Sequence, residues 1–399
     1  MTPSPRKVGV FFGGMSAEHE VSWRSARNVV LAMDPKRYQA IPILIDKQGR
    51  WFLLRREELF SDQILSGRKK TALGPKRRVL LDPDPGRLAV VDRTSGRPIQ
   101  TLDAVFPVTH GPHGEDGTLQ GLCKIYQIPF VGPGVLSSAV CMDKEVMKRL
   151  LLEQGIPIPR FLVFQAGAVG SGDLQAVGEK LGYPVFVKPA NLGSSVGITK
   201  VESPRALRKA VSYALQFDTK ALVEEFVEGR EVECSVLGNE HPAASIPGEI
   251  LPDPRHGFYS YDAKYKDPDG AALIIPAPLP QAVTATVRDL AVRSFVALGC
   301  EGMARVDFFV RRNGTVLVNE LNTIPGFTNI SMYPKLWEAS GLPCQELVHR
   351  LILLALERFE KEAALSRNYD EPPRRARSER RGKRGSKTRC PGTKRQGRG

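Results

Sequence analysis

Three oxygen-bearing side chains lie close together in the segment ARVDFFVRRNGTVLVNELNTIPGFT, residues 304–328. Asp307 falls on one expected strand, and Glu320 and Asn322 stand two residues apart on the next. Side chains two apart on a strand face the same side, and an Asn-Gly turn at 313–314 folds Asp307 back beside them. Oxygen ligands without Cys or His favour Mg²⁺ or Mn²⁺ shared with phosphates over zinc. The alternative, polar residues on a solvated sheet face, leaves the neighbouring apolar residues unexplained.

A second segment, FVKPANLGSSVG at 186–197, combines Lys188 on a strand with a loop of small residues that includes Ser194 and Ser195. Backbone N–H groups of such a loop can surround phosphate oxygens. The GxxxxGK[ST] motif is absent, and a Gly-Ser loop can equally be a flexible hairpin. Lys144, Lys188 and Lys264 would supply three positive charges for a triphosphate, although each lysine alone is commonly a surface residue.

Three further segments point to binding. In LVEEFVEGRE (222–231), an acidic and apolar mixture at a strand end suits a purine ring and ribose hydroxyls, or is simply a strand and linker. Glu18 in GGMSAEHEVS (13–22) follows a strand end, where ligands of open α/β sheets bind, and its carboxylate can hold an ammonium group. His110 and His113 in THGPHGEDGTLQG (109–121) lack a third metal ligand, so hydrogen bonding in a pocket is favoured over metal binding.

These residues must be positioned by strands that alternate with amphipathic helices, the pattern of an α/β protein with largely parallel sheets. Residues 46–101 are less regular, and we expect additional β-structure and loops there. A helix is expected over 142–155, with Asp143 in its first turn. Residues 252–270 are too long for a tight turn and form a candidate lid. Further helices are expected at 17–33 and 281–298, and strands at 7–12, 38–45, 104–108, 221–226, 231–237, 304–310 and 316–321.

Composition narrows the class of protein. The 399 residues predict two or three domains, and no apolar run is long enough to span a membrane. Six cysteines without CxxC spacing and a start without a signal peptide predict reduced thiols and a cytoplasmic protein. Residues 367–399 hold 13 Lys and Arg against three acids, so this tail carries ten of the net +14 charges. We expect a disordered tail, either a solubilising extension or a tether to nucleic acid or anionic lipid.

Seven motifs in order make the sequence resemble the D-alanine-D-alanine ligase family of the ATP-grasp superfamily. They are GGMSAEHEVS, HGPHGEDGTLQG, MDK, FVKPANLGSSVG, YDAKY (261–265), ARVDFF and NELNTIPGFT, and the resemblance covers about residues 7–350. It implies an α/β fold with three-domain ATP-grasp architecture. The implied parts are an N-terminal domain with an open parallel sheet (1–132), a central subdomain (133–227), a C-terminal subdomain (228–365) with the lid loop 252–270, and a disordered basic tail (366–399).

The resemblance also implies an activity. ATP, with two Mg²⁺ or Mn²⁺ ions, would drive the ligation of two D-alanines through a D-alanyl phosphate, supplying a peptidoglycan precursor for the cell wall. The ions would be bound by Asp307, Glu320 and Asn322. ATP would contact Lys144, Lys188, Ser194, Ser195, Glu224, Phe226, Val227, Glu231 and Lys264. The family pattern further implies a cytoplasmic homodimer without a membrane span, with at most a weak polyanion contact through the tail.

Roles around the two D-alanines are implied in the same way. Glu18 would bind the first ammonium and His110 would lie near the first carboxylate. Arg305 and the backbone N–H of Gly326 would stabilise the oxyanion that develops in the second step. The second D-alanine would contact Ser331 and Met332. Glu18, Ser194 and Tyr265 resemble the family's hydrogen-bonded trio that joins the domains.

Two alternatives remain open from the sequence. One is a ligase that uses D-lactate or another D-amino acid as the second substrate. Tyr265 favours the dipeptide, because relatives that make the depsipeptide usually carry another residue there. The other is a nucleic-acid-binding protein built on an inactive ATP-grasp body, an idea that depends only on the basic tail.

Overall fold

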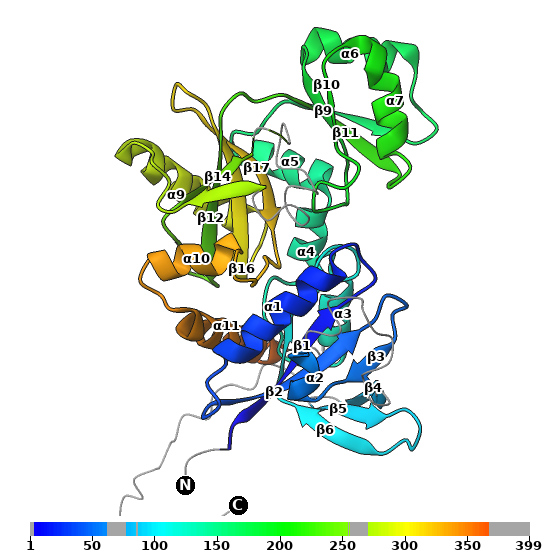
Figure 1. Ribbon diagram of the computed structural model, residues 1–399, viewed down its shortest axis with the longest axis vertical. Coiled ribbons are helices and arrows are strands. Elements are labelled where there is room, and N and C mark those ends of the chain that lie inside the picture. Colours follow the sequence, from blue (N-terminus) through cyan, green and yellow to red (C-terminus); the bar gives the residue numbers. More distant parts are fainter. Residues whose placement is uncertain (1–3, 62–76, 85–86, 254, 256–269, 367–399) are drawn as a thin grey trace, which may run out of the picture. The chain divides into compact units, whose positions relative to one another are not determined.

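The computed structural model describes residues 4–61, 77–84, 87–253, 255 and 270–366 (Figure 1). Residues 1–360 form one compact unit, to which the contacts below belong, and residues 361–399 form a second unit, described only through Ser366. The predicted disordered tail therefore lies outside the described residues, as does most of the predicted lid. Each of the three sheets falls inside one of the predicted domain ranges, which themselves stay predictions.

The first sheet has seven strands in the order β6-β5-β4-β3-β2-β1-β7. Their bounds are β1 Arg6–Gly13, β2 Tyr38–Ile45, β3 Trp51–Leu53, β4 Arg77–Asp84, β5 Arg87–Asp92, β6 Pro98–Leu102 and β7 Ala104–Pro107. Helices α1 (His19–Ala32), α2 (Arg56–Leu59) and α3 (Thr118–Ile125) belong to the same part of the chain. The predicted β-structure within 46–101 is confirmed by β3 to β6.

The prediction of largely parallel sheets is wrong outside one region. Only β1 with β2 and β1 with β7 pair in parallel among the named strands, and β2 to β6 pair in antiparallel fashion. Short connections explain the difference, since residues 46–50 between β2 and β3 cannot form the crossover that parallel strands need. The N-terminal sheet is thus parallel only around β1, whose carboxyl end leads to Glu18.

The second sheet, β10-β9-β11-β8, is entirely antiparallel. Its strands are β8 Phe161–Gln165, β9 Val185–Pro189, β10 Thr199–Val201 and β11 Lys220–Glu225, with helices α6 (Ser171–Lys180) and α7 (Pro204–Ala214). Helices α4 (Val135–Met142) and α5 (Lys144–Glu153) precede it. Asp143 is the N-cap of α5 rather than a first-turn residue, because its side chain accepts hydrogen bonds from the Glu145 and Val146 N–H groups.

The third sheet follows the order β15-β14-β12-β16-β17, with β13 paired to β12. Its strands are β12 Arg230–Gly238, β13 Ala243–Ala244, β14 Gly248–Pro252, β15 Ala271–Ile274, β16 Gly302–Val310 and β17 Val316–Asn322. Helix α9 (Gln281–Ala297) packs against β12, β16 and β17. Helices α10 (Met332–Ala339) and α11 (Cys344–Ala363) complete the described chain (Figure 1).

One buried core joins distant parts of the sequence. Phe12 of β1 and Trp23 of α1 belong to the same apolar cluster as Phe327, Tyr333 and residues of α11. Burial of this apolar surface ties the segment after β17 to the first helix. Residues 324–337 are therefore positioned by the N-terminal part of the chain as well as by the third sheet.

Two composition-based expectations can be compared with the structure. The described cysteines are free thiols, and all except the partly exposed Cys344 are buried, as predicted. Over the described ranges, every helix is too short or too polar to cross a bilayer.

Candidate active site

A cavity of about 130 Å³ brings together side chains from all three sheets. Its walls come from the start of α1, the loop after β7, the loop after β9, strands β16 and β17, and the segment after β17. The predicted site residues that line it are Glu18, His110, Ser194, Arg305, Glu320, Asn322, Gly326, Ser331 and Met332. Residues separated by up to about three hundred positions in the sequence thus face one small space.

The hairpin of β16 and β17 places Asp307 beside Glu320 and Asn322, as expected, with a register shift between Asp307 and Phe308. Asp307 pairs with Glu320 and Arg305 pairs with Asn322 across the two strands. Arg305 donates two hydrogen bonds of 2.7 Å to the Asp307 carboxylate and lies 3.0 Å from Glu233. Burial alone lowers the pKa of Arg305, but the Asp307 and Glu233 carboxylates outweigh it and raise that pKa. We call Glu233, Arg305, Asp307 and Glu320 the strand cluster.

The donor chemistry of this hairpin fits a magnesium-type ion. Asn322 Nδ2 donates to Asp307 Oδ2 at 3.0 Å, so the predicted ligands do lie together. Within the described part of the chain, no group of three or more His, Cys, Asp or Glu side chains has a metal-binding arrangement. The set has two carboxylates and one amide. All are oxygen donors, and Mg²⁺ usually takes one or two protein carboxylates together with substrate phosphates.

Lys188 and Glu224 meet beneath the second sheet, together with Lys148. Lys188 Nζ lies 2.7 Å from Glu224 Oε2, and Lys148 Nζ lies 3.2 Å from Glu224 Oε1. Asn319 accepts from both lysines, through its backbone oxygen from Lys148 and its side-chain oxygen from Lys188. We call Lys148, Lys188 and Glu224 the lysine cluster. Its three side chains are almost entirely buried.

Burial sets the protonation of the lysine cluster. Desolvation lowers the pKa of Lys148 to about 8, despite the nearby Glu224 carboxylate. For Glu224, burial raises the pKa, but the two lysines outweigh it and leave the pKa below its usual value. Glu224 is 3% exposed and its carboxylate pairs with the two lysines, and its role in recognising adenine or ribose stays a prediction.

The loop after β9 connects the two clusters to the first sheet. Lys144 Nζ donates to Leu192 O at 2.7 Å and lies 3.6 Å from Glu320. Ser194 Oγ donates a hydrogen bond to Glu18 Oε1. Ser194 and Ser195 have φ angles of 53° and 58°, an uncommon conformation for residues other than glycine. Such strained backbone often marks a functional loop, and here it lies in the loop predicted to bind phosphate.

The remaining predicted nucleotide contacts lie away from the cavity. The Phe226 ring is 39% exposed, and Lys200 Nζ lies 4.9 Å from its centre. Val227 is buried, and Glu231 lies on β12 opposite Ile250 and Phe309. Glu224 and Lys188 pair within the second sheet, whereas Glu231 belongs to the third sheet. Lys264 and Tyr265 lie outside the described residues.

His110 is held on both sides of its ring. Nδ1 lies 3.0 Å from Ile324 O, and Nε2 lies 3.2 Å from Ser25 Oγ. Burial lowers the pKa of His110, but Glu115, whose carboxylate is 3.7 Å from Nδ1, outweighs it and raises that pKa. His110 thus makes hydrogen bonds at the end of a strand, and His113 does not line the cavity.

The segment after β17 forms the opposite wall. Ser331 Oγ accepts from the Thr328 N–H at 2.9 Å. A Cβ on Gly326 would lie 2.7 Å from Ser331 Oγ, so only glycine fits without a shift. Met332, at the start of α10, is buried beside Ile250 and Leu336. Backbone and hydroxyl groups therefore face the cavity here, with an apolar residue behind them.

Three residues of this site were missed from the sequence: Lys148, Glu233 and Glu115. Lys148 follows Lys144 by one helical turn, so a lysine on the buried face of an amphipathic helix was an available signal. Glu233 lies on β12 opposite Asp307, a pairing between strands seventy residues apart that no local pattern indicates. Glu115 lies in the motif THGPHGEDGTLQG, but no feature of the sequence indicated a contact with His110.

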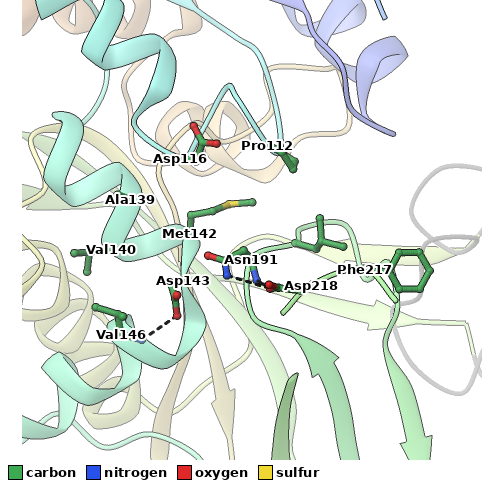
Figure 2. A pocket seen from close by; sticks show the side chains of 11 residues that line it. Pro112, Asp116, Ala139, Val140, Met142, Asp143, Val146, Asn191, Phe217 and Asp218 are labelled. Atoms are coloured by element: carbon green, nitrogen blue, oxygen red, sulfur yellow. Dashed lines mark hydrogen bonds between the residues drawn. The ribbon is translucent and has the colours of Figure 1, made fainter. Parts of the chain in front are cut away.

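A larger pocket of about 640 Å³ lies elsewhere, between α4, α5 and the loops near Asn191 and Asp218 (Figure 2). Its carboxylates already have partners. Asp218 accepts from Asn191 at 2.7 and 3.0 Å, and Asp143 caps α5 and pairs with Lys220. No predicted site residue lines it. Size alone therefore does not identify the site, and the smaller cavity has the reactive groups.

Known proteins match this chain over most of its length. Family models described as the D-ala D-ala ligase N-terminus and C-terminus match residues 7–133 and 150–353. The D-alanine--D-alanine ligase of Oceanobacillus iheyensis is 47% identical over 363 residues, which are 90% of this chain and 98% of that protein. D-alanine--D-alanine ligase A of Escherichia coli K12 is 46% identical over 362 residues, with the same coverage.

Solved structures agree. The D-alanine-D-alanine ligase from Coxiella burnetii has a TM-score of 0.80 at 38% identity and covers 90% of this chain and 97% of its own. The VanG D-Ala:D-Ser ligase from Enterococcus faecalis has a TM-score of 0.77 at 35% identity, covering 88% and 99%. The ordered motifs, the cavity and these matches lead to one conclusion. The chain belongs to the D-alanine-D-alanine ligase family of the ATP-grasp superfamily.

Proposed function

We propose that the protein ligates two D-alanines to D-alanyl-D-alanine at the expense of ATP, supplying a peptidoglycan precursor. The observation that carries the proposal is the meeting of Glu18, Arg305 and the Gly326 backbone in one cavity beside the Ser194 loop. A carboxylate for an ammonium, fixed donors for an oxyanion and a loop suited to phosphate are the groups this reaction needs.

The first half-reaction is a phosphoryl transfer. A carboxylate oxygen of the first D-alanine attacks the γ-phosphorus of ATP. The bond to the β,γ-bridging oxygen breaks and ADP leaves with its electron pair. Both reactants are anionic, so positioning and charge neutralisation dominate. Lys144 and Lys188 would bind phosphate oxygens, and Glu18 would hold the ammonium of the first D-alanine. Lys264 and Tyr265 keep the phosphate and lid roles that the sequence motifs suggest.

A divalent cation at Asp307, Glu320 and Asn322 would neutralise phosphate charge during this transfer. The oxygen-only donor set and the excess of carboxylates in the strand cluster support that assignment. Two Mg²⁺ or Mn²⁺ ions follow from the family pattern. Arg305 now pairs with Asp307, so in the ligated complex it would have to share or leave that carboxylate.

The second half-reaction forms the peptide bond. The amine of the second D-alanine attacks the acyl phosphate carbonyl, a C–N bond forms, the C–O bond to phosphate breaks, and the amine loses a proton. Arg305 and the Gly326 N–H would stabilise the oxyanion that develops at the carbonyl. Ser331 would bind the second carboxylate and Met332 would line the methyl pocket.

A second candidate is ligation of D-alanine to a different second substrate, such as D-serine or D-lactate. The observation in its favour is the match to a D-Ala:D-Ser ligase, almost as good as the match to a D-alanine-D-alanine ligase structure. The curated relatives at 46–47% identity over 90% of the chain support D-alanine instead.

The cellular setting follows from the same family pattern. We propose a cytoplasmic homodimer, with the basic tail making at most a weak polyanion contact. Sedimentation would give the oligomeric state. Truncation after Leu365 should leave ligation intact, and unchanged RNA affinity after truncation would remove the tail from that role.

The direct test uses the purified full-length chain with ATP, Mg²⁺ and millimolar D-alanine. We expect ADP, phosphate and dipeptide in equal amounts, and no turnover when D-alanine or Mg²⁺ is omitted. A folded protein that makes no dipeptide under these conditions would refute the proposal.

A further inference from the structure

Two side chains of α1 bind the backbone of one residue in the segment after β17. Ser25 is fully buried, and its Oγ accepts a hydrogen bond of 3.1 Å from the Phe327 N–H. Asn28 Nδ2 donates to the Phe327 carbonyl oxygen at 2.7 Å and to Asn329 Oδ1 at 2.9 Å. Both polar groups of the Phe327 backbone are therefore fixed by a helix about three hundred residues earlier in the chain.

Phe327, whose backbone is bound by Ser25 and Asn28, directly follows Gly326. Glycine is the residue with the greatest backbone freedom, so it cannot fix the direction of its own N–H group. A Cβ at this position would lie 2.7 Å from Ser331 Oγ, so a larger residue would require the Ser331 side chain to shift. The peptide that joins Gly326 to Phe327 is planar, and its N–H is the group bound by Ser25. The Gly326 N–H belongs to the preceding peptide, between Pro325 and Gly326, so α1 fixes the chain directly after Gly326 and limits the direction of the Gly326 N–H through the Gly326 backbone.

Ser25 also reaches the predicted first-substrate subsite. Its Oγ lies 3.2 Å from His110 Nε2, while His110 Nδ1 lies 3.0 Å from Ile324 O. The Phe327 N–H donates to Ser25 Oγ, and the same oxygen lies within hydrogen-bond distance of His110 Nε2. One buried hydroxyl thus connects both ends of the segment 324–327.

The same helix carries the predicted ammonium ligand. Glu18 occupies the N-cap position of α1, and Ser25 and Asn28 follow it by seven and ten residues. At 3.6 residues per turn these positions lie along one face of the helix. Any shift of α1 would therefore move Glu18, the predicted ammonium ligand, together with the Ser25 and Asn28 side chains that bind the Phe327 backbone.

We propose that Ser25 and Asn28 are positioning residues that hold the Gly326 N–H where the oxyanion of the second half-reaction develops. The proposal rests on the proposed function, since it assumes that Gly326 donates to that oxyanion. Neither side chain needs to touch substrate. Their effect is predicted to fall on peptide-bond formation and not on phosphoryl transfer, because the lysine cluster and the strand cluster are held by other contacts.

The experiment compares the two half-reactions in Ser25→Ala and Asn28→Asp proteins. Phosphoryl transfer is followed by the D-alanine-dependent scrambling of ¹⁸O between the β,γ-bridge and β-nonbridge positions of ATP, and ligation by the dipeptide kcat and the KM of the second D-alanine. We expect the dipeptide kcat to fall about 10- to 100-fold, as for a small misplacement of a reacting group, and the KM to rise. Isotope scrambling should continue at the wild-type rate or faster.

Ser22→Ala is the matched control. Ser22 is also a fully buried serine of α1, and its Oγ accepts from the Gly13 N–H and donates to Val108 O, both at 2.7 Å. The Ser22→Ala protein loses a comparable number of hydrogen bonds, but none of them involves the segment 324–329. We expect lower thermal stability but no selective loss of ligation.

Equal losses of scrambling and ligation in Ser25→Ala, or the same pattern in Ser22→Ala, would overturn the proposal. If Ser25→Ala fails to fold, Asn28→Asp serves as the test. Asn28 is only half-buried and aspartate has the same shape, so this variant should fold. An unchanged ratio of the two rates in that variant would also overturn the proposal. A wild-type protein that scrambles ATP isotope without forming dipeptide would instead refute the proposed function itself.

Discussion

The lysine cluster and the strand cluster are neighbours along β17 but have opposite charge balances. Asn319 contacts Lys148 and Lys188, and the next residue, Glu320, belongs to the strand cluster. In the lysine cluster two ammonium groups face one carboxylate. In the strand cluster three carboxylates face one guanidinium, and they still outnumber the cations when Lys144 is counted. One cluster therefore favours an anion and the other favours a cation.

The two clusters also differ in exposure. Lys148 is fully buried, while the Glu320 side chain is 25% exposed and lines the cavity. A buried charged pair is held by its own geometry, whereas an exposed excess of carboxylates is open to a ligand. The comparison indicates that the lysine cluster is a fixed framework and the strand cluster an incomplete site. The phosphates of a nucleotide would balance the positive charge of the lysine cluster, and its divalent cation would balance the negative charge of the strand cluster.

The largest effect should come from Glu320→Gln. Removing one carboxylate from the strand cluster should lower kcat about 10³-fold, because metal stabilisation of a transferring phosphoryl group is worth several kcal/mol. Mn²⁺ binding in the presence of ATP, followed by electron paramagnetic resonance, should weaken in parallel. The exposed Glu338→Gln on α10 is the control. Near-normal Mg²⁺ dependence would contradict the ligand assignment.

Lys148→Met should test whether the lysine cluster is a framework. Removing one partner of a buried charged group should lower the free energy of unfolding by about 3 kcal/mol. The double variant Lys148→Met with Glu224→Gln should recover part of this loss, because the buried carboxylate is gone. A loss below about 1 kcal/mol would argue against the framework role.

The same variant gives a pH test. Folded Lys148 has its pKa lowered to about 8, while an unfolded lysine titrates near ~10.4. Between these pH values the unfolded chain binds more protons, so the contribution of Lys148 to unfolding free energy rises with pH. The difference between wild type and Lys148→Met, measured by urea unfolding, should therefore grow from pH 8 to 10. A flat difference would contradict the lowered pKa.

Ser194→Ala, in the loop that lines the cavity, should have an intermediate effect on substrate binding. It removes the hydrogen bond to Glu18, and a bond to a charged group is worth about 1.5–3 kcal/mol. We expect the KM for D-alanine to rise about tenfold or more, with little change in the thermal midpoint. Ser203, which makes no side-chain cap bond at α7, is the control. An unchanged KM would show that the hydrogen bond between Ser194 and Glu18 does not contribute to D-alanine binding.

The smallest effect should come from Lys200→Met. Lys200 pairs with Glu202 at 2.8 Å, but both side chains are substantially exposed. Exposed pairs contribute little, so we expect a change below about 0.5 kcal/mol in unfolding free energy. A loss as large as that of Lys148→Met would show that burial is not what separates the two kinds of lysine.

Local patterns explain why part of this site could be predicted from the sequence. Asp307 and Glu320 lie on the two strands of a short hairpin whose Asn-Gly turn could be recognised, although a register shift beside Asp307 sets their pairing. The Ser194 loop and Glu18 were found from local patterns, a loop of small residues and a carboxylate after a strand end, and the contact between them was expected from the resemblance. Lys264 and Tyr265 stay predictions.

The rest depends on packing between distant segments. Lys148 meets Glu224 across 76 residues and Ser25 meets Phe327 across 302, and no periodicity in one segment specifies a partner in another. The antiparallel pairing in the first sheet was missed for a different reason, since connections such as residues 46–50 are too short for a crossover. Alternating strands and helices suggested crossovers, but the strands β2 to β6 pair with their neighbours in the sequence.

The most direct test of the account is product analysis from one mixture of D-alanine, D-serine and D-lactate, each with a distinct isotope label, with ATP and Mg²⁺. Mass spectrometry would identify every condensed product, and ADP would be measured in the same sample. The account predicts D-alanyl-D-alanine as the main product, formed one for one with ADP. A main product containing D-serine or D-lactate, or ADP release without any condensed product, would contradict it.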